Sequence, residues 1–192
     1  SPAATLSALL QAAETAIVAA DATRGVQQPP TTTELLGVLA AIRAAHHSKQ
    51  EDIASIIAAA QQALADLPPA IGSWRSVALM CLGFAYQMNG SVRAAEQTLA
   101  EAIQLCQDAG NHYSAVVGNM SLARSRMMQG RLHDAAATYT QGLAQAAQKG
   151  MQQLSAIAQA HINLGRLHYE WNELALAEQQ LQTGLAQLQG QV

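Results

Sequence analysis

The sequence predicts an all-α fold, an α-α superhelix in which about four antiparallel helix hairpins follow one N-terminal helix. Apolar residues recur at three- and four-residue intervals along nearly the whole chain, as they do on one face of a helix. Half of the 192 residues are hydrophobic, whereas only 4% are aromatic and 12% are charged, so we expect an aliphatic core. A similar segment also returns at a nearly constant interval, which is typical of stacked repeats.

The returning segment is a tight turn followed by a helix. Its three clear copies are MNGSVRAAEQTL at 88–99, MQGRLHDAAATY at 128–139 and EWNELALAEQQL at 170–181. The turns centre on Gly90, Gly130 and Asn172, because Gly adopts a left-handed conformation freely and Asn tolerates it better than most residues. The copies lie 40 and 42 residues apart, and QEDIASIIAAAQQAL at 50–64 fits as a degenerate earlier copy.

Nine helices are expected in chain order from the periodicity and from helix start and stop signals. Their expected ranges are 3–22, 34–47, 51–66, 74–88, 92–108, 112–128, 132–148, 152–170 and 174–189. Thr33 or Thr32 is expected to cap the second helix and Ser73 the fourth, because a hydroxyl oxygen accepts a hydrogen bond from the first turn. Proline pairs at 29–30 and 68–69 stop the helices before them.

The hairpins are expected to form a single domain over residues 1–192. Its parts are an N-terminal helix and loop at 1–33, a degenerate repeat at 34–72, and clear repeats at 73–110, 111–150 and 151–192. Small residues recur twelve positions apart in the clear repeats, as Gly83 with Ala95, Ala123 with Ala135, and Gly165 with Ala177. Such pairs allow two helix axes to approach closely. Because the chain begins at Ser1 without Met, we expect a fragment of a longer protein.

These features resemble the tetratricopeptide pattern, with Tyr86 in its tyrosine place. Its large apolar place is occupied by Leu99, Tyr139 and Leu181. The period exceeds the usual 34 residues by six to eight. Long repeats of this kind, with AGNHY at 109–113 and YEWNELALAEQQL at 169–181, resemble the helical-repeat region of MalT-like transcriptional activators of the LuxR class, over roughly residues 34–190.

The resemblance implies a cytoplasmic regulator in which an N-terminal nucleotide-binding module and a C-terminal helix-turn-helix flank the repeats. In that family the repeat region receives an inducer or a regulatory protein and controls self-association. The chain contains neither a GxxxxGK[ST] phosphate loop nor a basic recognition helix. We therefore expect ATP and DNA binding to belong to other parts of such a regulator.

Helical spacing from the small crossing residues predicts which side chains face the concavity of the superhelix. The expected binding residues are Val77, Met80, Phe84, Met120, Arg124, Met127, Ile162, Arg166 and Tyr169. Methionines adapt to varied partners, so this face suits a partner helix or an apolar ligand, although burial between hairpins is the commoner role of any one Met. Arg124 and Arg166 would bind a carboxylate or phosphate, but pairs with Glu170 or Asp134 within the chain are favoured.

Other candidate sites are weaker. Tyr113 and Trp171 flank repeat junctions, where we expect an aromatic wedge between hairpins, with a docking surface as the alternative. His161 and His168 share a helix face but lie two turns apart, too far for one ion, so we expect no metal and no cofactor. Because no Ser, His and Asp grouping, nucleophile elbow or carboxylate pair is recognisable, we expect no enzyme.

Charge and hydropathy argue against further classes of function. A net charge of −3, with scattered Lys and Arg, argues against binding of nucleic acid by this domain. The longest apolar runs, such as that at 6–20, contain Gln and Glu and are shorter than the roughly 20 residues that cross a bilayer. No secretory signal opens the chain, and Cys81 and Cys106 are expected to be buried, reduced thiols of a cytoplasmic protein.

The leading interpretation is therefore a sensor or interaction domain whose concave face binds a protein partner or a small-molecule inducer, with self-association as a further mode of response. The alternative is a constitutive scaffold that joins proteins and senses nothing. A hydrolase in the groove is the third and weakest hypothesis.

Overall fold

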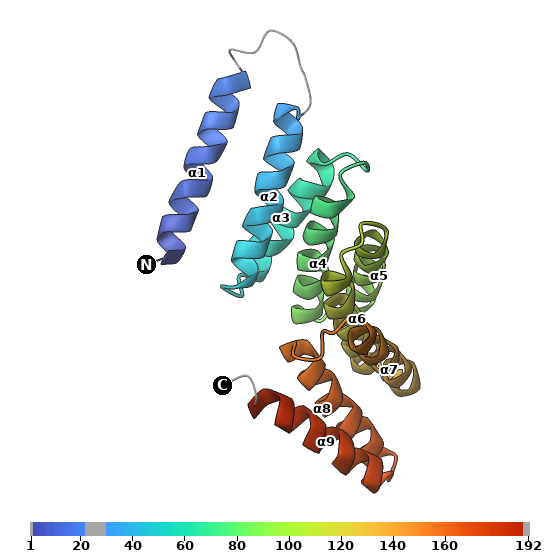
Figure 1. The fold of residues 1–192 in the computed structure, drawn as a ribbon. Helices are drawn as coiled ribbons and strands as arrows, with labels where there is room; N and C mark the ends of the chain where they lie inside the picture. The colour runs from blue at the N-terminus through green and yellow to red at the C-terminus, as the bar shows by residue number, and fades with distance from the viewer. Residues whose placement is uncertain (1, 22–29, 190–192) are drawn as a thin grey trace. The chain divides into compact units, whose positions relative to one another are not determined.

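The computed structural model describes residues 2–21 and 30–189 of the chain, and these ranges contain only helices and their connections (Figure 1). The helices are α1 (Pro2–Asp21), α2 (Thr32–Ser48), α3 (Ile53–Asp66), α4 (Gly72–Met88), α5 (Val92–Asp108), α6 (His112–Met128), α7 (Leu132–Gln148), α8 (Ser155–Glu170) and α9 (Leu174–Gln189). The predicted all-α fold class is confirmed, and α5, α6, α7 and α9 begin and end at the predicted residues. None of the described helices combines the length and apolar character needed to span a bilayer.

Two predicted helix caps are wrong. Thr31, not Thr32 or Thr33, caps α2: its hydroxyl accepts a 3.2 Å hydrogen bond from the Glu34 N–H, and the Glu34 carboxylate accepts a 2.7 Å bond from the Thr31 N–H. Three consecutive threonines are equally able to cap, and the reciprocal bond with Glu34 selects the first of them. Ser73 lies within α4, which begins one residue earlier.

The predicted left-handed turns are confirmed. Gly90, Gly130 and Asn172 have φ angles of 82°, 76° and 60°. Each follows the last turn of a helix. After Gly130 and Asn172, the N–H of the next residue returns to a carbonyl of that turn, from Arg131 to the Arg126 oxygen at 3.0 Å and from Glu173 to the His168 oxygen at 2.8 Å. Only a residue that tolerates positive φ closes a helix in this way, which explains why Asn replaces Gly in the last copy.

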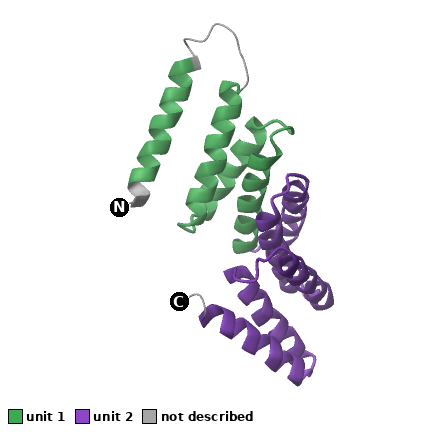
Figure 2. Ribbon diagram, viewed as in Figure 1, with its two compact units in different colours: residues 1–89 green, residues 90–192 purple. Residues whose placement is uncertain are grey.

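The described chain divides into two compact units, residues 1–89 with α1 to α4 and residues 90–192 with α5 to α9 (Figure 2). In the first unit, α2, α3 and α4 pack through an alanine-rich core around the fully buried Ile56. The helix α1 lies alongside α2 (Figure 1), where Leu10 is buried and the Arg43 guanidinium pairs with the Glu14 carboxylate at 2.6 Å. The predicted buried thiols are confirmed, since Cys81 and Cys106 are both free and buried.

In the second unit, glycines let α8 and α9 approach closely. A Cβ on Gly184 would lie 2.9 Å from the backbone oxygen of Ala158, and one on Gly165 would lie 3.1 Å from that of Ala177. A Cβ less than 3.0 Å from a backbone atom forces that backbone to shift, so Gly184 requires Gly. At Gly165 an added Cβ would also lie 2.6 Å from the Leu181 side chain, which would have to move. The predicted close approach at Gly165 and Ala177 is thus present.

An ion-pair network joins the N-terminal part of α5 to the end of α6 and to the connection between α6 and α7. The Glu96 carboxylate accepts hydrogen bonds from Arg126 at 3.0 Å, from Arg131 at 2.8 Å and from Gln129 at 2.9 Å. Burial alone would raise the pKa of Glu96, but the hydrogen bonds from Gln129 and Arg126 and the charges of both arginines outweigh it, so the pKa lies below 4.5.

Candidate functional site

The predicted binding residues fall in both units and differ in exposure. In the first unit, Met80 is buried and Val77 and Phe84 are half-buried. In the second unit, the exposed members are Arg124, Arg166 and Tyr169, the half-buried ones are Met127 and Ile162, and Met120 is buried. The second unit therefore brings two cations and an aromatic side chain to the surface of α6 and α8.

A cavity of about 120 Å³ lies where α6, α7 and α8 meet. It is lined by Val117, Met120, Ser121, Arg124, Tyr139, Ala156, Gln159, Ala160 and Asn163. On α6 and on α8 these residues are spaced three or four positions apart, so each helix turns one face toward the cavity. We call these nine residues the arginine cavity. Two of the predicted residues, Met120 and Arg124, belong to it.

A buried polar pair forms the floor of the arginine cavity. The Asn163 side-chain amide donates a 2.8 Å hydrogen bond to the Tyr139 hydroxyl, and the two residues are 5% and 1% exposed. Burial raises the pKa of Tyr139 to about 12, although the Asn163 bond and the charges of Arg124 and Arg166 act in the opposite direction. Arg124 lines the cavity itself, and Arg166 lies three residues after Asn163 on α8, on the same face of that helix.

Neither Arg124 nor Arg166 forms the ion pair that the sequence pattern favoured. Asp134 instead pairs with Arg131 at 2.8 Å, and no ion pair joins Glu170 to Arg124 or Arg166 among the described residues. The prediction of ion pairs within the chain is therefore wrong. Although Glu170 and Asp134 are near the two arginines in the sequence, the fold does not bring their carboxylates within ion-pair distance of either guanidinium group. Both arginines are exposed, Arg124 lines the cavity, and neither guanidinium group forms an ion pair within the described residues.

The methionines of the predicted face separate into two groups. Met80 and Met120 are core residues, as the commoner role predicts, whereas Met127 is half-buried and packs against the core of the second unit. Met120 also lines the arginine cavity and packs over Gly142, so it gives the cavity an adaptable apolar wall.

Trp171 packs between hairpins as the predicted aromatic wedge, whereas Tyr113 does not. The Trp171 ring stacks on the ring of His133, with centroids 4.6 Å apart, and packs against the core of the second unit. Tyr113 is 55% exposed, because its position on α6 turns it away from that core. His161 and His168 hydrogen-bond to Gln180 and Glu173, both at 2.6 Å, and the described residues contain no group of three metal-binding side chains.

Sequence reasoning missed Tyr139 as a site residue. It placed this residue with Leu99 and Leu181 at a large apolar position of the repeat. The signal was the hydroxyl itself, since a phenol at a position where other copies have Leu must find a buried partner. Asn163 is that partner.

Solved structures confirm the fold. BtubC (BKLC) from P. vanneervenii has a TM-score of 0.71 at 16% identity, with 95% of this chain and 72% of that chain covered. The apo form of RapI has a TM-score of 0.74 at 9% identity, covering 95% of this chain and 65% of that one. The Rap conjugation gene regulator of the plasmid pLS20, in complex with the Phr* peptide, has a TM-score of 0.66 at 17% identity, covering 81% and 43%. Identities this low show the fold alone.

Family membership rests on the sequence match. No curated protein matches the chain significantly. Residues 37–192, by contrast, match the family described as the MalT-like TPR region. This match covers most of the chain and includes α3 to α9 in full. The chain therefore belongs to the MalT-like TPR family of helical-repeat interaction domains.

Proposed function

We propose that this chain is the interaction segment of a MalT-like transcriptional activator of the LuxR class, and that its arginine cavity binds a peptide segment of a protein partner. In this proposal the ligand presents a carboxylate to Arg124 and Arg166 and places an apolar side chain over Met120. The observation that carries it is the pair of unpaired guanidinium groups beside a cavity with one apolar wall. The regulator would act in the cytoplasm, with ATP and DNA bound by flanking modules.

The size of the cavity favours a peptide over a small-molecule inducer. Sites for drug-sized ligands usually enclose about 300–1,000 Å³. The arginine cavity, at about 120 Å³, has room for roughly four water molecules. That volume fits one anchoring side chain, while the rest of a peptide would lie along the exposed surface of α6 and α8. A structural neighbour is a Rap regulator solved with a Phr* peptide, which is a precedent for peptide binding on this fold.

The charge of the site favours an acidic ligand. Arginine binds carboxylates through two parallel hydrogen bonds, and such charge-assisted bonds are about twice as strong as neutral ones. Two free guanidiniums near the buried Tyr139 hydroxyl also repel cations from the cavity. We therefore expect selected peptides to carry an Asp, a Glu or a free C-terminal carboxylate near an apolar residue.

Peptide selection followed by affinity measurement tests the proposal. Peptides would be selected on the wild-type chain from a random library, and binding measured by fluorescence anisotropy with Arg124→Gln and Arg166→Gln. Arg93→Gln is the matched control, because Arg93 is also exposed in the second unit but lies on α5, away from the cavity. Each cavity variant should weaken binding roughly tenfold, and the control should not. Equal binding by all three variants would show that the site lies elsewhere.

The alternatives give other results. A small-molecule inducer would raise the melting temperature in a screen of sugars, nucleotides and small acids, because a ligand selective for the folded state stabilises it. A constitutive scaffold would bind its partner but leave the activity of the full-length regulator unchanged. A hydrolase would show an activity that disappears when polar residues of the cavity are substituted.

A further inference from the structure

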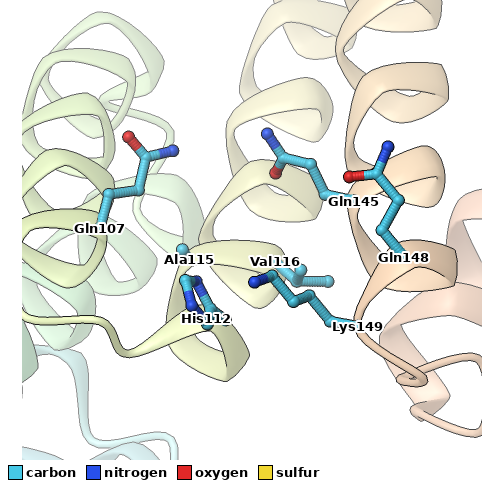
Figure 3. Close-up of a pocket in the computed structure, with 7 residues that line it drawn as sticks. All are labelled: Gln107, His112, Ala115, Val116, Gln145, Gln148 and Lys149. Atoms are coloured by element: carbon cyan, nitrogen blue, oxygen red, sulfur yellow. The ribbon is translucent and has the colours of Figure 1, made fainter.

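A second cavity, of about 150 Å³, lies on a different face of α6 (Figure 3). It is lined by Gln107, His112, Ala115, Val116, Gln145, Gln148 and Lys149, which come from the end of α5, the start of α6 and the end of α7. At 3.6 residues per turn, residues 112, 115 and 116 of α6 point away from residues 117, 121 and 124 of the arginine cavity. We call this second site the glutamine cavity. It is separate from the site of the proposed function.

Polar groups from all three helices converge on the glutamine cavity. Figure 3 shows the amides of Gln107, Gln145 and Gln148 above an apolar base, and the Lys149 side chain extended from the end of α7 toward α6. The base consists of the buried Ala115 and Val116. Polar groups placed around an apolar base can fix the orientation of a bound ligand.

Most of these polar groups have free hydrogen-bonding capacity. Among the described residues, the side chains of Gln107, Gln148 and Lys149 form no hydrogen bond or ion pair within the chain. Gln145 is held in place, since its oxygen accepts a 3.1 Å hydrogen bond from the amide of the buried Asn119. That bond orients the Gln145 side chain and leaves its own N–H groups to donate. The cavity therefore offers an ammonium group and several amide donors. None of its lining residues is a carboxylate that could pair with the ammonium charge.

We propose that the glutamine cavity binds a carboxylate, held by the Lys149 ammonium group and by the amides of Gln145 and Gln148. Each carboxylate group carries one negative charge, so the single charge of Lys149 neutralises one such group. Phosphate sites more commonly use arginine forks or several cations, which this cavity lacks. At about 150 Å³ the cavity holds the volume of roughly five water molecules, enough for a glutamate side chain or a small dicarboxylic acid.

Two sources can supply this carboxylate, and nuclear magnetic resonance of the ¹⁵N-labelled chain separates them. The first probe is succinate, with succinamide as its uncharged counterpart. The second is a capped pentapeptide with one central Glu among glycines, with Gln replacing Glu as its counterpart. Inorganic phosphate is the third probe. Signals of Gln107, His112 and Gln148 report on the cavity, and their dependence on ligand concentration gives the affinity.

Lys149→Gln removes the charge, and Lys49→Gln is the matched control. Lys49 is the only other lysine in the sequence and ends α2 in the first unit. Both lysine side chains are exposed, so neither substitution should affect folding. Loss of a charge-assisted hydrogen bond should weaken carboxylate binding roughly tenfold to a hundredfold in the Lys149 variant, with no change in the control.

The expected result is a shift of the cavity signals with succinate or with the Glu peptide, and not with their uncharged counterparts. A response to succinate alone identifies a free acid as the ligand, and a response to the peptide alone identifies a protein partner. Three results would overturn the proposal: no shift with either carboxylate probe, tighter binding of phosphate than of both, or unchanged binding in Lys149→Gln. None of them affects binding at the arginine cavity, which uses other residues.

Discussion

Gly184 tests whether the close packing of α8 and α9 determines the choice of residue. It is buried in α9, and an added Cβ would lie 2.9 Å from the Ala158 backbone oxygen and 2.9 Å from the Ile162 side chain. In an ordinary helix interior, Gly→Ala stabilises by about 1 kcal/mol, because Ala loses less backbone entropy on folding. At Gly184 the same change forces the two helices apart, so the usual sign should reverse.

The expected magnitude follows from two opposing effects. Adding a methylene to a closely packed site costs about 1–3 kcal/mol, and here the atom in the way is backbone, which cannot rotate aside. The propensity gain offsets about 1 kcal/mol of this cost. Gly184→Ala should therefore destabilise the chain, by up to about 2 kcal/mol. Gly142→Ala makes a useful comparison, because its Cβ would overlap only the terminal methyl of Met120, which can move to another rotamer.

Urea denaturation followed by far-UV circular dichroism measures the change in free energy of unfolding. Ala186→Gly, at an exposed position two residues further along α9, gives the propensity effect in the same helix and should destabilise by about 1 kcal/mol. Gly142→Ala should be close to neutral. Because repeat proteins can unfold in parts, amide hydrogen exchange in α8 and α9 should locate the Gly184 effect there. If Gly184→Ala stabilises by as much as Ala186→Gly destabilises, the proposed backbone conflict is absent.

Two further predictions concern polar groups of the second unit, the half-buried Glu96 and the buried Tyr139. Glu96→Gln removes the charge between Arg126 and Arg131 and should destabilise by about 1 kcal/mol above pH 5, as measured by urea denaturation. Because the folded-state pKa of Glu96 is lowered, its stabilisation exists above the unfolded value and is lost as pH falls through the folded one, so the variant should show a smaller loss of stability in acid. Tyr139→Phe leaves the Asn163 amide without its acceptor and should destabilise by about 1–3 kcal/mol, whereas an unchanged stability would mean that Asn163 has found another acceptor. The tyrosine absorbance of the wild type should contain a component that titrates near pH 12 and is missing from this variant, since burial holds that phenol protonated.

The sequence predicted the backbone well because its signals were local. Helix ends such as those of α5, α6 and α7 depend on a turn residue and on the apolar period, both of which are visible within a few residues. The cap of α2 was misplaced because adjacent threonines carry the same local signal. The contacts between side chains of different helices, by contrast, do not depend on local signals alone. Whether Arg124 reaches Asp134 depends on the spacing of two helices, and that spacing depends on every residue between them.

At the candidate sites, the sequence nevertheless contained information about which side chains line a cavity. The copies of a repeat can be aligned with one another. A residue that differs in type from its counterparts in the other copies therefore indicates a different local environment at that position. Tyr139 stands where Leu99 and Leu181 stand in other copies, and it forms the floor of the arginine cavity with Asn163. Arg124 occupies the place that Phe84 holds in the preceding copy, and it is exposed beside that cavity. The conserved geometry of the hairpin fixes where these side chains point, because the small crossing residues set the register of each helix pair. A polar residue at a position that is apolar in the other copies thus either destabilises the repeat or faces a cavity that accommodates it. Tyr139 and Arg124 both line such a cavity.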